Sequence, residues 1–417
     1  MEIKRDRYLQ ELIDRKHNGL IKIVTGIRRC GKSFLLSTLY AGWLKEQGVS
    51  DDHIIDINLE DRRNKALRDP DNLLAFIDSK IKDDDMHYIM IDEIQLVPEF
   101  EDVLNSYLNM PNADVYVTGS NARFLSSNVR TEFAGRGDEI RLHPLSFSEF
   151  SSTRGDDKTL NLREYMIFGG MPQVVLRKTE KEKSEVLKAL FQRTYIRDIV
   201  ERYNIKNTDV LDKLLDIVAS SIGGLINPTK LCNTFESIRH EKVNRMTITS
   251  YLNYLCESFL IGKSSQYDIK GKRYIDSPYK YYFSDSGLRN ARLNFRQIEF
   301  THLLENIIYN ELLIRGFNVD VGVVSKQVRT DDGSRIRRNY EVDFVCNQSS
   351  RRYYIQSAYK MIDEEKVRQE ENSLRNIDDS FKKIIILGEP TPVIRNEYGI
   401  TIISIYDFLL NENSLEL

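Results

Sequence analysis

Short apolar runs separated by polar turns recur through the first part of the chain. The run at 20–24 is followed, after a glycine-containing turn, by the helical pattern SFLLSTLY at 33–40. Further strand-like runs lie at 86–92 and 113–118. Apolar strands that alternate with helices are typical of a parallel sheet whose two faces are covered by helices. The pattern therefore predicts an α/β domain at the start of the chain.

After a polar loop at 151–161, which marks a domain boundary, the pattern becomes helical. Thr179-x-x-Glu182 forms a capping box that predicts the start of a helix. One apolar stripe follows the capping box at helical spacing, formed by Val186, Leu187, Leu190, Phe191 and Tyr195. This segment is predicted to be a helical connector.

Residues 226–285 follow the order of a winged helix. A short helix is predicted after Asn227-Pro228, then a second helix that starts with a cap at Thr247 or Thr249, and then a hairpin that turns at 268–273. Recognition-helix and wing positions that would contact DNA are occupied by Thr247, Ser250, Asn253, Lys270, Lys272 and Arg273. Winged helices also bind proteins. The sequence therefore leaves two functions open for this segment, DNA contact and protein docking.

The last third of the chain has the order helix, three strands, helix, strand, which resembles the PD-(D/E)xK nuclease fold. Glu305 and Asp343 occupy two metal-ligand positions of that fold. Such a site also needs a second strand carboxylate and a lysine, but the chain has Gln356 and Ala358 there. Lys360 would share their face if the strand continued. We therefore predict a nuclease-like domain that has lost its reaction.

Composition and charge agree with a folded protein of several domains. The chain has 417 residues, of which 41% are hydrophobic and 29% charged. Its net charge is −3, but residues 1–150 carry −6 and the remainder carries +3. A nucleic-acid partner would therefore contact the later part of the chain.

The cysteines and histidines are scattered. Four cysteines without a C-x-x-C pair, and six histidines away from metal-ligand spacing, predict neither a disulfide framework nor a zinc site. Cys30 is predicted to be either a small packing residue or a thiol whose pKa is lowered by the helix N-terminus. The charged start of the chain and the lack of an apolar run of about 18 residues predict no membrane partner and a cytoplasmic location.

The turn after the first strand reads Gly26-x4-Gly31-Lys32-Ser33. Its glycines let backbone N–H groups converge on phosphate oxygens, and the next helix directs its positive end at the same anion. In this pattern the lysine contacts the β- and γ-phosphates, and the serine hydroxyl binds Mg²⁺. ATP is therefore predicted to contact Gly26, Ile27, Arg28, Arg29, Cys30, Gly31, Lys32, Ser33 and Phe34.

Polar residues at the ends of two later strands complete a candidate catalytic set. Asp92 would hold Mg²⁺ with Ser33, and Glu93 would orient the attacking water. Ser120 and Asn121 would contact the γ-phosphate, with an N-cap as the alternative role. Mg²⁺-dependent hydrolysis of ATP follows as the expected chemistry.

With these motifs, residues 1–150 resemble an AAA+-type P-loop ATPase. The segments TGIRRCGKS, IDEIQ, VTGSNARFL, AGR and HPLSFSEF are similar to those of a prokaryotic ATPase family with a nuclease-like C-terminal domain. The resemblance implies a five-stranded parallel sheet in the order 5-1-4-3-2, with helices on both faces. The implied strands lie near 20–25, 53–59, 87–91, 113–118 and 138–142.

The same resemblance assigns roles outside the phosphate loop. Arg136, just before the last strand, would complete the active site of a neighbouring subunit, which implies a homo-oligomer. Gly169, Gly170 and Pro172 match a lid element. A sensor arginine would be one of three candidates, Arg193, Arg197 and Arg202.

The predicted architecture is thus an α/β P-loop domain (1–150), a helical lid or connector (151–205), a winged-helix-like domain (206–295) and a degenerate restriction-endonuclease-like domain (296–417). The favoured function is an ATPase whose nucleotide state switches its oligomer or domain arrangement, with DNA or a protein as partner. The alternatives are a nucleotide-gated DNA-binding regulator with little hydrolysis, and an ATP-dependent nuclease.

Overall fold

The computed structural model describes residues 3–120, 135–239, 242–329, 334–360 and 364–417. The chain divides into two units, the first formed by 1–144 with 257–259 and the second by 145–256 with 260–417. The first boundary lies close to the limit predicted at residue 150. Asn121, a predicted γ-phosphate contact, lies outside the described residues.

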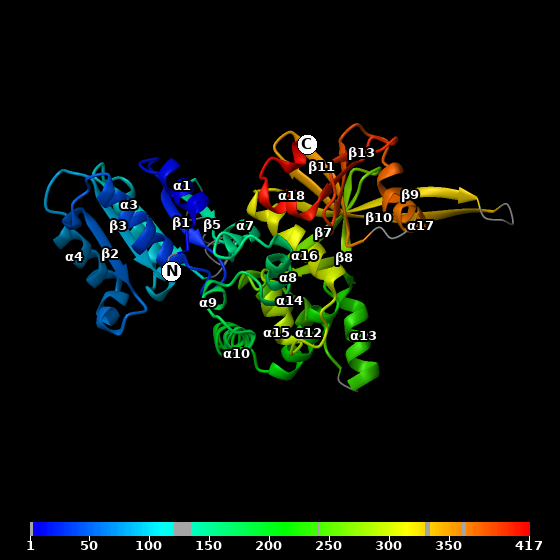
Figure 1. Ribbon diagram of the computed structural model, residues 1–417. Helices are drawn as coiled ribbons and strands as arrows, with labels where there is room; N and C mark the ends of the chain where they lie inside the picture. The colour runs from blue at the N-terminus through cyan, green and yellow to red at the C-terminus, as the bar shows by residue number, and fades with distance from the viewer. Residues whose placement is uncertain (1–2, 121–134, 240–241, 330–333, 361–363) are drawn as a thin grey trace. The chain divides into compact units, whose positions relative to one another are not determined.

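The first unit is built on five parallel strands in the order β2-β3-β4-β1-β5 (Figure 1). This order confirms the predicted arrangement, and each strand lies within a few residues of its predicted position. The strands are β1 (Ile21–Thr25), β2 (Ile54–Asn58), β3 (His87–Asp92), β4 (Ala113–Gly119) and β5 (Gly137–Arg141). Because the strands are parallel, the residues that follow β1, β3 and β4 gather at one edge of the sheet.

Helices join these strands. They are α1 (Asp6–Asp14), α2 (Lys32–Phe34), η1 (Leu35–Tyr40), α3 (Ala41–Glu46), η2 (Asp51–His53), η3 (Arg62–Arg68), α4 (Pro70–Lys80), η4 (Ile94–Leu96) and α5 (Phe100–Leu108). Side chains of α4 and α5 pack on the isoleucine and valine side chains that point to one face of the sheet. On the other face, Tyr40 of η1 contacts Tyr116 of β4. The central strands β1, β3 and β4 are accordingly buried on both faces.

One charged residue interrupts this apolar core. Lys22 of β1 is fully buried, and its ammonium group forms an ion pair with Asp114 of β4. The hydroxyl of Tyr116 donates a second hydrogen bond to Asp114, at 2.7 Å. A buried charge requires such partners because removing it from water costs several kcal/mol.

The second unit begins with helices. They are α7 (Phe147–Ser151), α8 (Lys158–Phe168), α9 (Pro172–Val175), α10 (Glu180–Ala189), η6 (Leu190–Ile196), α11 (Arg197–Arg202), α12 (Thr208–Ser220), α13 (Pro228–Arg239) and α14 (Arg245–Glu257). The predicted capping box at the start of α10 is confirmed. Helix α14 begins two residues before Thr247, because Asn244 caps it and accepts a hydrogen bond from the N–H of Met246. The prediction that a cap at Thr247 or Thr249 starts this helix was therefore wrong.

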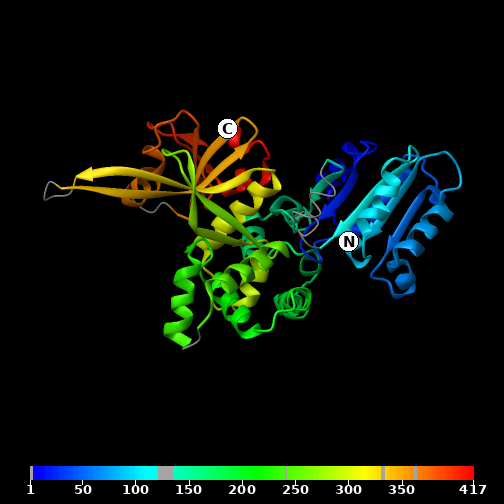
Figure 2. The ribbon, with the colours of Figure 1, turned by 180° about the vertical axis from the view of Figure 1, so that it is seen from behind.

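A single sheet of nine strands, in the order β13-β14-β12-β11-β10-β9-β7-β8-β6, runs through the rest of the unit (Figure 2). The strands are β6 (Leu225–Ile226), β7 (Ile261–Asp268), β8 (Arg273–Phe283), β9 (Asn318–Arg329), β10 (Arg335–Gln348), β11 (Arg351–Ala358), β12 (Lys382–Leu387), β13 (Ile394–Arg395) and β14 (Thr401–Ser404). The later helices are α15 (Ser286–Arg292), α16 (Phe300–Ile314), α17 (Glu364–Arg375), α18 (Ile405–Leu410) and η7 (Ser414–Glu416).

Parallel pairing of β7 with β9 joins the segments predicted as 206–295 and 296–417 into one sheet. Within each segment the predicted helices and strands occur in the predicted order, and the structure adds α12, β6, α15, β13, β14 and α18 to them. The division of the second unit into separate domains stays a prediction.

Candidate nucleotide site

The loop between β1 and α2 has a backbone that few side chains would permit. Gly26, Arg29 and Gly31 have φ angles of 142°, 65° and 107°. A Cβ atom on Gly26 would lie 2.1 Å from the carbonyl oxygen of Leu142, which follows β5. Glycine is therefore required at Gly26 both for the conformation and for the close packing against the neighbouring chain segment.

Lys32, at the end of this loop, is only 4% exposed. Its ammonium group donates to the carbonyl oxygens of Gly26 at 3.2 Å and Ile27 at 3.4 Å. It also lies 4.0 Å from a carboxylate oxygen of Glu93. The ammonium group of Lys32 is thus held beside the loop, where it could contact a bound phosphate group.

Ser33 and Asp92 come together as the sequence predicted. The Ser33 hydroxyl donates to the Asp92 carboxylate at 2.8 Å, and the hydroxyl of Thr118 donates to the same carboxylate at 2.6 Å. Burial raises the pKa of Asp92 above its ordinary value, with these hydrogen bonds opposing the shift. A hydroxyl next to a carboxylate is a set of hard oxygen ligands that suits Mg²⁺.

Thr118 was missed by the sequence analysis, and it orients both acidic residues. While its hydroxyl donates to Asp92, the same oxygen accepts the backbone N–H of Glu93 at 2.9 Å. Glu93 has a left-handed φ of 57° and is largely buried, and its carboxylate accepts a hydrogen bond from the side-chain amide of Gln95. The sequence indicates Thr118 only as a polar residue that follows the apolar residues 115–117.

The loop is also supported from beneath by Arg5, for which the sequence carried no signal. This buried guanidinium donates to the carbonyl oxygens of Cys30 at 3.3 Å and His143 at 2.7 Å. Cys30 itself is fully buried, and burial raises the pKa of its thiol. Of the two readings of Cys30, the structure supports the packing residue and not the activated thiol.

The other predicted site residues occupy different environments. Ser120 is buried directly after β4, and Arg28 forms an ion pair with Glu60 at 2.5 Å. Arg29 and Phe34 are exposed beside the loop. Arg136 is exposed before β5, where its guanidinium donates to the side-chain oxygen of Asn105 at 3.3 Å.

The second unit contains a buried cation that the sequence did not indicate. Lys280 of β8 is 2% exposed, and its ammonium group lies 2.9 Å from Glu305, 2.7 Å from Glu341 and 3.7 Å from Asp343. Burial alone would lower the pKa of Lys280, but the attraction of these carboxylates outweighs it and holds the pKa above its ordinary value. Burial also raises the pKa of Glu305, to about 7. An internal ammonium group thus occupies the centre of the carboxylate cluster.

Gln356 and Ala358, which occupy the predicted carboxylate and lysine positions, and Lys360 lie in three different environments. Gln356 accepts the N–H of Asp343 and donates to Glu370, and Ala358 is buried in an apolar cluster. Strand β11 ends at Ala358, and Lys360 beyond it pairs with Glu389 at 2.9 Å. The idea that Lys360 shares a strand face with Gln356 is therefore wrong, because the strand does not extend to it.

Of the basic residues predicted to contact nucleic acid, Lys270 and Lys272 lie in the turn between β7 and β8, and Arg273 begins β8. Lys270 pairs with Asp378 at 2.8 Å, and Arg273 lies 3.8 Å from Asp268. Lys272 adopts a left-handed φ of 50°. Two of the three charges are therefore already close to carboxylates.

The lid residues pack against Asp285. Its carboxylate accepts the N–H of Gly170 at 2.7 Å, and a Cβ atom on Gly169 would lie 2.2 Å from the same carboxylate. Arg197 and Arg202 form ion pairs along their own helix. Their role as a nucleotide sensor stays a prediction, as does that of Arg193.

Sequence comparison supports the assignment of the first unit. A family model described as an AAA domain matches residues 18–151, and a domain of unknown function, DUF8612, matches residues 159–299. An uncharacterized protein of Haemophilus influenzae is 34% identical over 414 residues, which are 98% of each chain. An uncharacterized protein of Methanocaldococcus jannaschii is 30% identical over 363 residues, covering 84% of this chain and 77% of that one.

Solved structures that resemble the chain share little of its sequence. The Aeropyrum pernix ORC1 protein in complex with DNA aligns at a TM-score of 0.32 and 11% identity, covering 70% of this chain and 93% of that one. Cdc6p from Pyrobaculum aerophilum aligns at a TM-score of 0.29 and 12% identity, covering 73% and 94%. Scores this low carry no argument about function.

No helix among the described residues is both long and apolar enough to cross a membrane. The assignment of the first unit rests on its strand order, on the loop that follows β1 and on the AAA family match. The chain belongs to the same protein family as the two uncharacterized proteins from Haemophilus influenzae and Methanocaldococcus jannaschii, and its first unit is an AAA+ domain of the P-loop nucleotide-binding type.

Proposed function

We propose that the protein is a Mg²⁺-dependent ATPase. The observation that carries this proposal is the joint placement of Lys32, Ser33, Asp92 and Glu93 at the edge of the sheet where β1 and β3 end. Backbone N–H groups of the loop and the Lys32 ammonium bind the phosphates, as in other P-loop proteins. Mg²⁺ held by Ser33 and Asp92 would neutralise charge on the β- and γ-phosphates.

Glu93 acts on the attacking water in this proposal. Its carboxylate accepts a proton from water and orients the oxygen toward the γ-phosphate, while Gln95 and Lys32 hold the carboxylate in place. Ser120, at the end of β4, is proposed to contact the γ-phosphate. Phosphate release and nucleotide binding by Lys32→Ala and Glu93→Gln variants test the proposal.

Arg136 is proposed to act on the nucleotide of a neighbouring subunit. Its side chain is exposed, and within the described residues its guanidinium makes one long hydrogen bond, to Asn105, which favours a role toward a second chain. We expect Arg136→Ala and Lys32→Ala proteins to be at least about 10-fold less active separately, with turnover regained when the two are mixed. Solution mass shows whether mixed oligomers form, and phosphate release measures their turnover. Mixed oligomers that do not regain turnover would contradict action between subunits.

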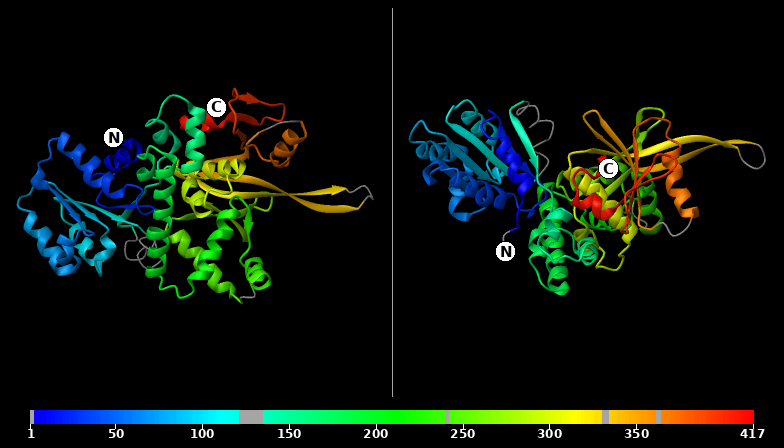
Figure 3. Two further views of the ribbon diagram at one scale, coloured as in Figure 1. Left: turned by 60° about the horizontal axis from the view of Figure 1, so that its bottom comes forward. Right: turned by 45° about the horizontal axis from the view of Figure 1, so that its top comes forward.

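A second candidate function, binding of duplex DNA, is favoured by one specific observation. The outer part of the β9–β10 hairpin carries five exposed basic side chains and extends beyond the rest of its sheet (Figure 3). They are Lys326, Arg329, Arg335, Arg337 and Arg338, and no ion pair joins any of them to another residue in the described ranges. A two-stranded ribbon fits the major groove, and exposed cations on it attract phosphates.

The hairpin proposal is tested with labelled duplex DNA at several salt concentrations. Replacing Arg335, Arg337 and Arg338 with alanine should weaken binding at least about 10-fold and lower the log–log salt slope by roughly one unit per lost phosphate contact. Alanine at Lys181 and Lys188, two exposed lysines of α10, is the matched control and should leave binding unchanged. Equal losses in both variants, or no binding by the parent protein at low salt, would remove this function.

We also propose a fold for two segments of the second unit. We interpret α12, β6, α13, α14, β7 and β8 as a winged helix, since β6 pairs with β8 beside the β7–β8 hairpin. The segment from α16 onward is interpreted as a nuclease-like fold without its reaction, since Lys280 lies among its carboxylates.

A further inference from the structure

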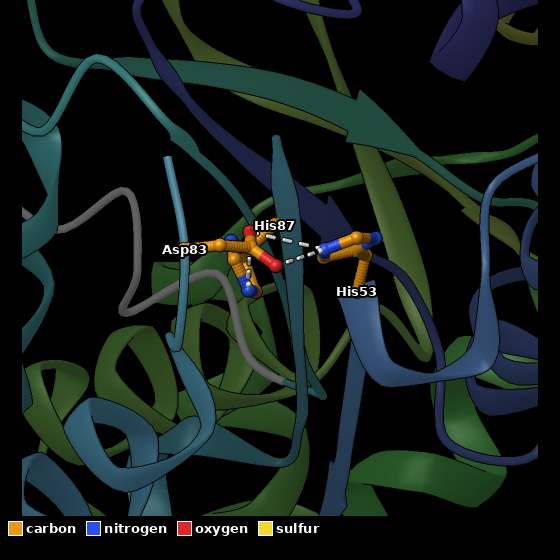
Figure 4. A group of neighbouring side chains, drawn as sticks. All are labelled: His53, Asp83 and His87. Atoms are coloured by element: carbon orange, nitrogen blue, oxygen red, sulfur yellow. Dashed lines mark hydrogen bonds and ion pairs between the residues drawn. The ribbon is translucent and has the colours of Figure 1, made fainter. Parts of the chain in front are cut away.

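Two histidines and an aspartate gather at the edge of the first sheet opposite the phosphate loop (Figure 4). His53 ends η2 immediately before β2, and His87 is the first residue of β3. Asp83 lies in the connection between α4 and β3. Because β2 and β3 are paired and parallel, both histidines lie at their amino-terminal ends.

The ligand atoms of these residues converge. One side-chain donor atom from each residue lies within 4.8 Å of the other two. Nε2 of His53 is 3.1 Å from both oxygens of Asp83, and Nε2 of His87 is 3.9 Å from one of them. The two imidazole rings meet edge to face, with their centroids 4.7 Å apart.

The protonation pattern of His87 makes its Nε2 available. Nδ1 of His87 lies 2.8 Å from the carbonyl oxygen of Asp85, which can only accept, so Nδ1 carries the proton. Nε2 then presents a lone pair, and it makes no hydrogen bond to any residue that the structure describes. His87 is 1% exposed, so this lone pair is buried and aimed at Asp83. A carbonyl partner on the far nitrogen is the usual support of a metal-binding histidine.

The other two residues are held in position as well. Nδ1 of His53 is 2.8 Å from the hydroxyl of Ser50, and the carboxylate of Asp83 accepts the N–H of Asp85 at 3.1 Å. The Asn112 side chain donates to the carbonyl oxygen of Asp83 at 3.0 Å, which ties the loop to the start of β4. The three side chains are therefore oriented by their surroundings before any ion arrives.

We propose that His53, Asp83 and His87 form a binding site for a divalent transition-metal ion of the zinc class, separate from the nucleotide site. Two imidazole nitrogens and one carboxylate oxygen leave a fourth tetrahedral position for water. Imidazole ligands favour Zn²⁺, Co²⁺ and Ni²⁺ over Mg²⁺, so the magnesium that accompanies ATP would not compete. The ion would fasten the α4–β3 connection to the ends of β2 and β3.

The two sites are well apart. His87 and Asp92 occupy opposite ends of β3, and five residues of strand at about 3.3 Å each separate them by roughly 16 Å. The proposed metal is therefore a structural clamp and not a catalytic participant. Its effect should be seen in stability and metal affinity without any measurement of ATP hydrolysis.

The test uses the full chain, stripped of metal with a chelator and titrated with Zn²⁺ in a calorimeter. A single equivalent of Zn²⁺ should bind and raise the melting temperature, and Co²⁺ should give the visible absorption of a tetrahedral ion. Asp83→Asn and His53→Ala should each weaken binding at least about 10-fold. Both positions are partly exposed, so these variants should fold; His87→Gln is a third variant in the core.

Matched controls separate this site from general metal binding. Asp84→Asn removes the adjacent exposed carboxylate, and His302→Ala removes an exposed histidine of the second unit. Both should bind Zn²⁺ as the parent does. If the parent shows no Zn²⁺-dependent rise in melting temperature, or if Asp84→Asn loses as much affinity as Asp83→Asn, the cluster is a proton-dependent ion pair and the metal proposal is overturned.

Discussion

Glu93→Gln should leave ATP binding intact and slow hydrolysis at least about 100-fold. The amide is nearly isosteric with the carboxylate, so the contacts with Gln95 and Lys32 keep their geometry, but it cannot accept a proton from water. Phosphate release with excess Mg²⁺ and ATP measures the rate, and calorimetry with a slowly hydrolysed analogue measures binding.

Lys32→Ala is the complementary variant and should lose nucleotide binding, because it removes the buried ammonium group that is proposed to bind the phosphates. Glu99→Gln, an exposed glutamate six residues after Glu93, is the matched control and should match the parent in both measurements. Unchanged turnover in Glu93→Gln would remove the proposed mechanism, whatever the result with Lys32→Ala.

Lys280→Met should be the most destabilising single change in the second unit. It leaves Glu305, Glu341 and Asp343 around an uncompensated centre, and breaking a buried charge cluster in this way costs about 3–5 kcal/mol. For a unit of this size the melting temperature should fall by roughly 6–20 °C. Thermal unfolding followed by circular dichroism gives the value.

Two further variants show whether charge is the cause. Lys263→Met changes an exposed lysine of the neighbouring strand β7 and should have little effect on the melting temperature. Adding Glu305→Gln to Lys280→Met should recover part of the loss, because it removes one of the unpaired charges. Mn²⁺ should stabilise Lys280→Met and not the parent if the ammonium stands where a nuclease metal would bind. A Lys280→Met protein as stable as the parent would show that the cluster does not need this cation.

Much of the first unit follows from contiguous sequence. The glycines and Lys32 of the loop lie within seven residues, and the strand before the loop is mainly apolar. Asp92 and Glu93 come at the end of another such strand, so parallel pairing brings them to the loop without any further information. Thr118 and Arg5 could not be assigned in this way, because their roles depend on which atoms lie across the sheet.

The second unit was harder to interpret because its important contacts join distant segments. Lys280 meets Glu341 across 61 positions of the chain, and nothing near either residue indicates the other. Lys360 illustrates a different error, since the prediction placed it on the face of Gln356 and Ala358 by extending the strand two residues beyond its end. Strand ends depend on pairing with neighbours, which local pattern does not report.

By itself the sequence determined that a phosphate-binding loop follows the first strand of a parallel sheet, and that a pair of acidic residues ends a later strand. These features depend on the local backbone and on the spacing of apolar residues. Only the tertiary structure decided that Lys280 lies among Glu305, Glu341 and Asp343, and that His53, Asp83 and His87 converge. The reason is physical: burial and electrostatic attraction act between residues that the pairing of strands brings together, however far apart they lie in the chain.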